Sequence, residues 1–325
     1  MRYARLAPGR GFSPLRACAQ ALDRLMLDPT VRYLAEETLS RAVSFFQPAS
    51  PVSDPNLRDK VAQLHKTGLI RLGPMLNAAQ IADICGSLAG APVFDATDRL
   101  RTLNAPGTAD AAIIGYPIPV VLGCPHLLEL ANEPRLLALV GAYLGCKPTI
   151  ITWGLLRSRP AIGCAAITQK FHRDREGWRS VKLFVYLTDV DEVAGPHMYA
   201  CGSHRTRSSL RARCYSDAEV AARTGSQNIE TITGEAGFGF LADTFGLHKG
   251  ESPAARERLI LQIHYACVPS PLYIYGPLRP SRAVHGLDPY VNRLFLARAD
   301  EPEARLDECE SVPQPGKKEE ITAVP

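Results

Sequence analysis

A histidine and a carboxylate lie one residue apart in the stretch "KFHRDREGW", at His172 and Asp174. An apolar run with the composition of a strand, "VKLFVYLTDV", follows at 181–190. Residues i and i+2 of a strand point to the same face, so the two side chains would aim at one point. Such a pair is either a metal-binding fork or two polar residues exposed on a strand, and three residues alone do not decide between these alternatives.

A third ligand would turn the fork into a facial triad. Two histidines and one carboxylate that leave part of the coordination sphere open form the arrangement of non-haem Fe(II) oxygenases. The second histidine of such a triad must come from farther along the chain, on another strand. The downstream candidates are His197, His204, His248, His264 and His285.

Among these histidines, His248 has the most informative neighbours. It directly follows the apolar segment "GFGFLADTFGL", and Arg258 opens the strand-like segment "RLILQIHYA" ten residues later. The oxidant in this chemistry derives from a keto acid whose far carboxylate needs an anchor, and the guanidinium fork of arginine pairs both carboxylate oxygens. We expect one hairpin to deliver His248 and Arg258 together, with Arg256 as the alternative anchor. His264 has no such partner downstream, and a buried core position suits it better.

The order of these segments resembles the phytanoyl-CoA dioxygenase family from about residue 57 to about residue 298. The motifs that carry the resemblance are "FHRD", "VKLFVYLTDVD", "AGPHMYACGSHR" and "GEAGFGFLADTFGLHKG". The resemblance implies a double-stranded β-helix, a jelly-roll or cupin-like core, with flanking helices. It also implies a dioxygenase that uses Fe(II), 2-oxoglutarate and O2 to hydroxylate an unactivated C–H of a small molecule, releasing succinate and CO2.

The resemblance also implies roles for individual residues. His172, Asp174 and His248 would bind iron, and Arg258 would bind the C5 carboxylate of 2-oxoglutarate. Halogenating relatives lack the carboxylate ligand, so the presence of Asp174 favours hydroxylation or a related oxidation such as desaturation or ring closure.

Similarity to the ectoine hydroxylases of this family adds Arg157 and Trp178 to the expected site, and the positive charge beside His172 and Asp174 adds Arg175. Arg157 matches a second basic residue that contacts the co-substrate, and Arg159 is its competitor. Trp178 matches the tryptophan of a His-x-Asp-x-x-x-Trp pattern and, with Arg175, would contact the substrate. The resemblance does not extend to ectoine as the substrate, because the remainder of the pocket does not match.

Two other functions fit the same ligand set. A His/Asp/His site can hold Zn²⁺ and activate water for hydrolysis. The expected keto-acid clamp argues against that hydrolase, and the complete ligand set argues against a non-catalytic binding module on the same barrel. The cations near the fork are either a solvated face or an attraction for an anionic substrate; they are Arg173, Arg175, Arg179 and Lys182.

Composition excludes several other classes. The 325 residues carry a formal net charge of only +4 and no basic arm, so a nucleic-acid partner is not expected. The nine cysteines form no CxxC pair, which is typical of a reduced intracellular protein. No apolar run approaches the roughly 18 residues of a membrane span. We therefore expect a soluble, cytoplasmic protein without a membrane partner.

The chain divides into three expected parts. Residues 1–56 form a helical extension, with helices over 14–46 split at Pro29, and a Pro/Ser-rich linker; these helices are candidates for a homodimer interface. Residues 57–299 form the dioxygenase domain, and 300–325 an acidic, mobile tail.

Within the domain, two helices are expected before the strands. The first has a capping box at Asn77 and Gln80, and the second a cap at Asn132 and a stop at Gly145. A long irregular loop is expected over 98–125, and a short helix within 207–226. Irregularly spaced strands favour an antiparallel core; they are expected at 149–157, 181–190, 234–243 and 258–266.

Overall fold

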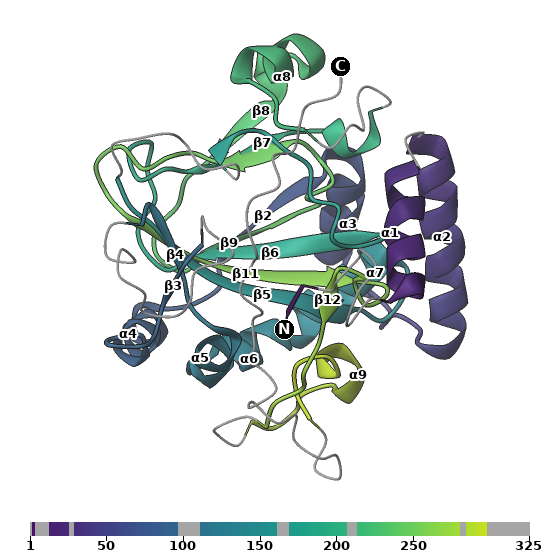
Figure 1. The fold of residues 1–325 in the computed structure, drawn as a ribbon, viewed down its shortest axis with the longest axis horizontal. Helices are drawn as coiled ribbons and strands as arrows, with labels where there is room; N and C mark the ends of the chain where they lie inside the picture. Colours follow the sequence, from purple (N-terminus) through teal and green to yellow (C-terminus); the bar gives the residue numbers. More distant parts are fainter. Residues whose placement is uncertain are drawn as a thin grey trace, which may run out of the picture.

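Two antiparallel sheets form the centre of the molecule (Figure 1). The computed structural model describes residues 2–3, 13–25, 29–96, 111–160, 169–206, 213–279 and 284–297. The larger sheet has the order β2-β9-β6-β11-β5-β4-β3, and the smaller one the order β10-β7-β8. The expected antiparallel β core with flanking helices is therefore confirmed.

The strand bounds are as follows. The larger sheet contains β2 (Leu69–Pro74), β3 (Phe94–Asp95), β4 (Ile113–Gly115), β5 (Thr149–Ser158), β6 (Ser180–Tyr186), β9 (Phe238–Ala242) and β11 (Arg258–Ala266). The smaller sheet contains β7 (His197–Ala200), β8 (Ile229–Ile232) and β10 (His248–Gly250). A separate two-stranded pair joins β1 (Arg2–Tyr3) to β12 (Tyr273–Ile274).

Helices cover the larger sheet on the side away from β7 and β8, and α1 and α2 stand at one end of it (Figure 1). Their bounds are α1 (Pro14–Leu25), α2 (Pro29–Phe46), α3 (Pro55–Thr67), α4 (Ala78–Ser87), α5 (Ile118–Gly123), α6 (Leu127–Ala131), α7 (Pro134–Leu144), α8 (Asp217–Thr224) and α9 (Pro289–Asn292). Within the described part of the chain, none of these helices combines the length and the apolar character needed to cross a bilayer.

The strand period of two divides the larger sheet into two chemically different faces. Alternate residues of β11 such as Leu259 and Leu261 are fully buried in the core shared with the helices. The intervening residues, such as Ile260, face the smaller sheet, where Phe184, Tyr199 and other side chains form a second apolar cluster. The catalytically interesting residues lie on this second face.

The helical lead-in agrees with its sequence signals, with one exception. The helix break at Pro29 and the capping box of α4 are present; the Asn77 side chain accepts from Gln80 N at 2.9 Å. Asn132 does not cap α7. Glu133 does so, because its carboxylate reaches the first free N–H groups of the helix, and Asn132 instead ends α6.

The strands agree less closely with their expected bounds. β11 is as expected, but β6 ends at Tyr186, and the expected strand at 234–243 is shortened to 238–242. The loop expected over 98–125 contains β4 and α5, while its first part, up to residue 110, lies outside the described residues. The expected hairpin of His248 and Arg258 is wrong, because β10 pairs with β7 and β11 pairs with β5 and β6.

Two expectations concern the ends of the chain and the thiols. The acidic tail lies outside the described residues. Large exposed apolar side chains gather on α1 and α2, which keeps homodimerisation through them a prediction; they are Leu15, Leu22, Val31, Tyr33, Leu34, Phe45 and Phe46. All cysteines within the described ranges are free thiols.

Candidate metal centre

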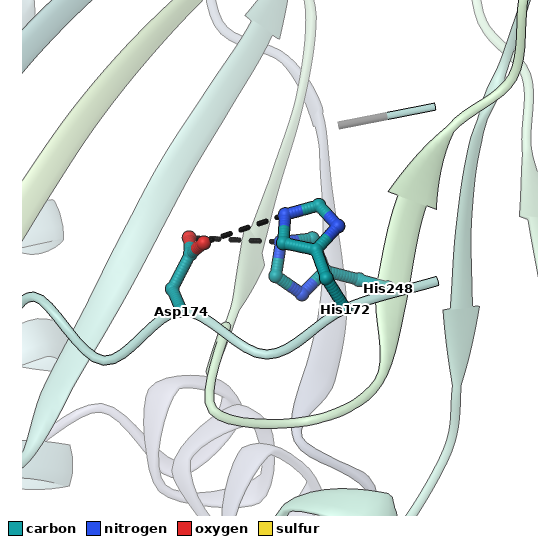
Figure 2. Close-up of side chains that lie close together, drawn as sticks. All are labelled: His172, Asp174 and His248. Atoms are coloured by element: carbon teal, nitrogen blue, oxygen red, sulfur yellow. Dashed lines mark ion pairs between the residues drawn. The ribbon is translucent and has the colours of Figure 1, made fainter. Parts of the chain in front are cut away.

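Three side chains from distant parts of the chain converge between the two sheets (Figure 2). One ligand atom from each of His172, Asp174 and His248 lies within 4.8 Å of the other two. The carboxylate of Asp174 faces both imidazoles, with Oδ1 3.5 Å from Nε2 of His172 and Oδ2 3.6 Å from Nε2 of His248. This is the only such cluster of three metal-ligating groups in the described residues.

The backbone holds the two histidines at this spacing. His172 and His248 form an isolated antiparallel bridge, in which each N–H donates to the other's carbonyl at 3.0 and 3.1 Å. The N–H of Asp174 donates to the carbonyl of Thr244 at 2.8 Å, which fixes the backbone two residues after His172. His172 is thus not part of a regular strand, but the bridge gives it and Asp174 the common direction that the strand period predicts.

Hydrogen bonds on the far side of each ring fix which nitrogen faces the carboxylate. Nδ1 of His172 lies 2.8 Å from the carbonyl of Lys170, and Nδ1 of His248 lies 2.9 Å from the carbonyl of Gly246. A carbonyl can only accept, so Nδ1 carries the proton and the Nε2 lone pair is available. Metal-binding histidines are oriented in this way, and the three residues therefore fit a divalent transition metal.

Lys182 holds the carboxylate from its other side. Its ammonium donates to Asp174 Oδ2 at 2.7 Å and lies 4.0 Å from Glu176 Oε2. Burial alone would raise the pKa of Asp174, but the positive charge of Lys182 and the hydrogen bond to His172 hold that pKa well below its usual range. The carboxylate is therefore ionised, as a metal ligand must be.

The two imidazoles differ in their affinity for protons. Burial lowers the pKa of His248 to about 3, and the attraction of Asp174 only partly opposes this. Burial also acts to lower the pKa of His172, but its hydrogen bond to Asp174 outweighs burial, and the pKa is raised. His248 is thus neutral over the whole working range of pH, whereas His172 competes for a proton near neutrality.

The triad opens onto a cavity of about 770 Å³ between the sheets. At one end, the buried guanidinium of Arg258 donates to the carbonyl of Gly195 and, through Nη2, to Ser158 Oγ at 3.3 Å. A Cβ atom on Gly250 would lie 2.7 Å from Arg258 Nη2, so a larger residue here would displace the guanidinium from its present position. Other lining residues, on both sides of the triad, are Thr152, Gly154, Leu156, Gln169, Phe184, Ile260 and Gln262.

Solved structures with this architecture are known. A crystal structure of EctD from S. alaskensis, determined with 2-oxoglutarate and 5-hydroxyectoine, is 21% identical in sequence with a TM-score of 0.50; the match covers 77% of this chain and 89% of that one. The chain therefore shares the fold of that structure, in agreement with its two antiparallel sheets. No protein-family model matches the chain, and no curated protein matches its sequence.

Two further solved structures are similar at lower scores. The non-haem α-ketoglutarate-dependent epimerase SnoN from nogalamycin biosynthesis is 18% identical over 72% of this chain and 97% of its own, with a TM-score of 0.48. HygX from Streptomyces hygroscopicus, with nickel and 2-oxoglutarate bound, is 15% identical over 75% of this chain and 96% of its own, with a TM-score of 0.47.

Arg157 does not line the cavity. From β5, the cavity is lined by the alternate residues 152, 154, 156 and 158 together with Trp153. Arg157 instead pairs with Glu257 on the face that carries Leu155, which is buried in the core shared with the helices. Its competitor Arg159 does not line the cavity either. Contact of either residue with the co-substrate stays a prediction, and the strand period, which turns Arg157 away from the cavity, gives it no support.

The residues that follow Asp174 lie only partly where they are expected. Arg175 lines the cavity, but Trp178 does not; its ring lies 5.7 Å from the guanidinium of Arg32 on α2. Arg179 also turns to α2, where it pairs with Glu37. Both residues lie within the bend at 176–179, which precedes β6 and turns their side chains toward α2.

Two residues of the site were not singled out by the sequence reasoning. Lys182 was counted only among the surrounding cations, and His197 only as one of several candidate ligands. The alternation of side chains along the strands could have indicated Lys182. Lys182 and Phe184 of β6 lie on the same face of the sheet as Arg258 of β11. The other downstream histidines behave as core or turn residues: His264 is fully buried beside Glu176, and His204 contacts the carbonyl of His65.

Proposed function

We propose that this chain is an Fe(II)- and 2-oxoglutarate-dependent dioxygenase that hydroxylates an unactivated C–H of a small molecule. The observation that carries the proposal is that the His172–Asp174–His248 triad and the buried Arg258 lie in one cavity. A three-ligand site leaves coordination positions open for a co-substrate, and a buried arginine needs an anion to compensate its charge.

The residues divide the work as follows. His172, Asp174 and His248 hold the ion, with Lys182 and the carbonyls of Lys170 and Gly246 orienting them. When bound, Fe(II) supplies the O2 chemistry that couples decarboxylation of 2-oxoglutarate to oxidation of a C–H bond, with succinate and CO2 released. The chain contributes the geometry and a shielded cavity.

Arg258 and Ser158 form the clamp for the distal carboxylate of 2-oxoglutarate. They face each other directly across the β5–β11 pair, and the Ser158 hydroxyl lies 3.3 Å from Arg258 Nη2. Burial lowers the pKa of Arg258, although a guanidinium stays charged at any physiological pH. The lining of Leu156, Phe184 and Ile260 keeps water from the clamp, which strengthens a charged hydrogen bond.

An anionic substrate fits the charges of the cavity. Among its described lining residues, five are cations and two are acids, namely Arg173, Arg175, Lys182, Arg213, Arg258, Asp174 and Glu176. Arg258 is matched to the co-substrate, Lys182 to Asp174 and Arg213 to Glu219. The lining as a whole still carries more positive than negative groups, which favours a negatively charged group on the substrate. Substitution of Arg175 by Gln is the direct probe, with a rise in substrate KM as the expected result.

The competing functions make different demands on the same residues. A Zn²⁺ hydrolase has no use for a buried arginine clamp beside the metal, and a non-catalytic module has no need of an assembled triad. The presence of both features in one cavity supports the oxygenase. Metal analysis of protein purified without air separates the hydrolase from the oxygenase, because it identifies zinc or iron directly.

The decisive assay measures succinate release with Fe(II), ascorbate and 2-oxoglutarate, across a panel of small metabolites with anionic groups. His172→Ala and Asp174→Ala should each lower turnover by at least about 100-fold, more than the effects typical of residues that only orient a ligand. His126→Ala is the matched control. It removes a surface imidazole that pairs with Asp83 far from the cavity, and it should leave turnover unchanged. Wild-type turnover in both triad variants would contradict the assignment.

A further inference from the structure

His197 lies between the triad and the arginine clamp. It stands opposite Gly250 in the β7–β10 pair, and its ring is nearly parallel to that of His248, with centroids 5.5 Å apart. Directly opposed residues of an antiparallel pair have Cβ atoms about 5 Å apart. The guanidinium of Arg258 lies 2.7 Å from where a Gly250 Cβ would be, so His197 and Arg258 converge on the same point of the cavity.

The ring of His197 has an unused polar atom. The residue is only 4% exposed, and its Nε2 has no hydrogen-bond partner among the residues that the structure describes. The remainder of the ring packs on Phe184 and Phe240, with centroids 4.6 and 5.3 Å away. An apolar residue would pack there equally well without leaving a buried polar atom unpaired, so packing alone does not account for a histidine.

The surroundings define what this nitrogen can bind. Arg258 already places a fixed positive charge beside it, which disfavours a cation and favours an anionic acceptor. His197 is not part of the metal cluster, although it lines the same cavity. A ligand that spans the space from the triad to Arg258 must pass its ring.

We propose that His197 donates a hydrogen bond from Nε2 to the distal carboxylate of 2-oxoglutarate and is thus the third donor of the clamp, with Arg258 and Ser158. This inference rests on the proposed function and adds to it a co-substrate-binding residue. His197 then makes the site selective for keto acids that carry a distal carboxylate.

The test compares two keto acids on the Mn(II)-loaded protein by isothermal titration calorimetry. 2-Oxoglutarate has the distal carboxylate, and 2-oxobutanoate lacks it. His197→Leu should weaken 2-oxoglutarate binding about 10- to 100-fold, the range for a hydrogen bond to a charged group. The same variant should bind 2-oxobutanoate and Mn(II) itself within about twofold of wild type, and His197→Gln, which retains a donor, should recover part of the loss.

Two further variants keep the result interpretable. His264→Leu removes another buried imidazole from the same face of the sheet, at the far end of β11 from Arg258, and should leave both keto-acid affinities unchanged. His197→Phe replaces the leucine variant if that protein does not fold, because a second ring can pack on Phe184 and Phe240.

The outcomes separate this inference from the proposed function. Unchanged 2-oxoglutarate affinity in folded His197→Leu or His197→Phe overturns the role of His197 and leaves the oxygenase proposal standing. Equal weakening of both keto acids also overturns it, because the effect would then act through His248 and the metal. A wild-type protein that binds neither keto acid overturns the proposed function together with this inference.

Discussion

The two faces of strand β11 carry opposite kinds of residue. On the side toward the helices, Leu259, Leu261 and Ile263 are completely buried among other apolar side chains. On the side toward the cavity, the intervening positions include Arg258, Gln262 and, at the far end, His264. One strand thus serves two purposes, because its period of two sends alternate residues to different layers.

The difference shows where the stability of the site originates. Each buried leucine on the helix side stabilises the fold by about 1.5–3 kcal/mol. The cavity side works against folding, since buried charges and unpaired polar atoms are unfavourable until a ligand compensates them. The Nε2 atoms of His264 and His197 are examples of such unpaired atoms in the described residues. The helix layer therefore supports a cavity that is strained in the absence of its ligands.

The difference between the two faces of β11 can be tested by mutating two adjacent residues of that strand. Leu261→Ala should lower the free energy of unfolding by about 2–5 kcal/mol, because it leaves a hole in a fully buried apolar layer. Gln262→Leu, one residue along and facing the cavity, should cost less than about 1 kcal/mol. Chemical denaturation of the metal-free protein measures both values.

The activities of the same two variants should show the reverse order. Folded Leu261→Ala should keep the wild-type affinity for Mn(II) and 2-oxoglutarate, whereas Gln262→Leu should alter substrate KM. Equal destabilisation by the two substitutions would show that the faces do not differ in the way described.

A smaller effect is expected from Lys182, the cation that holds the metal-binding carboxylate. Lys182→Met retains the length of the side chain but removes the 2.7 Å hydrogen bond to Asp174. Loss of a residue that orients a ligand typically weakens metal binding about 10- to 100-fold, and we expect about tenfold for Mn(II). Titration followed by the electron paramagnetic resonance of free Mn(II) measures the affinity.

Lys147→Met is the matched control for this variant. Lys147 makes an equivalent ion pair with Asp288, at 2.9 Å, away from the cavity. Its loss should leave the Mn(II) affinity unchanged, and an unchanged affinity in Lys182→Met as well would remove Lys182 from the site.

The pH dependence of metal binding should give the smallest effect, and His172 should dominate it. Only the neutral imidazole binds a metal, and the pKa of His172 is raised above its ordinary 6.5. As the pH is lowered, the affinity for Mn(II) should therefore begin to fall while the pH is still above 6.5. Below the raised pKa of His172, the affinity should fall by up to about tenfold for each further unit of pH, because one proton competes with the metal. His248, with a pKa of about 3, should add nothing in this range.

The stability of the metal-free protein should vary in the opposite sense. A raised pKa in the folded state means that His172 contributes stability below about 6.5 and loses that contribution as pH rises through the raised value. Asp174→Asn removes the carboxylate that raises this pKa, so the stability transition of the metal-free protein should move to lower pH. A midpoint below 6.5 for the titration of His172 in the metal-free wild type would contradict this account.

Much of the site could be predicted because its signals are local. The bounds of β11 and the position of Arg258 at its start follow from a continuous β-branched and aromatic run. The helix cap at Asn77 uses a side chain within three residues of its partner. The family resemblance then indicated a set of ligands that the structure brings together.

The remainder depended on tertiary structure. Arg157 was assigned by similarity, yet the parity of β5 relative to β11 places it on the outer face. Trp178 and Arg179 are close to the fork in sequence, but a turn directs them to α2, which no local pattern reveals. The expected hairpin failed for a similar reason, because the ten residues between His248 and Arg258 cross from one sheet to the other.

The reciprocal backbone hydrogen bonds between His172 and His248 have a consequence for how the site tolerates change. Because these hydrogen bonds belong to the main chain, folding itself sets the distance between the two histidine donors, before any ion binds. A metal then meets a preorganised pair of donors and need not gather two flexible segments. Replacement of either imidazole removes a donor but leaves its counterpart in register. The centre is therefore open to exchange of ions and ligands without rebuilding of the fold around it.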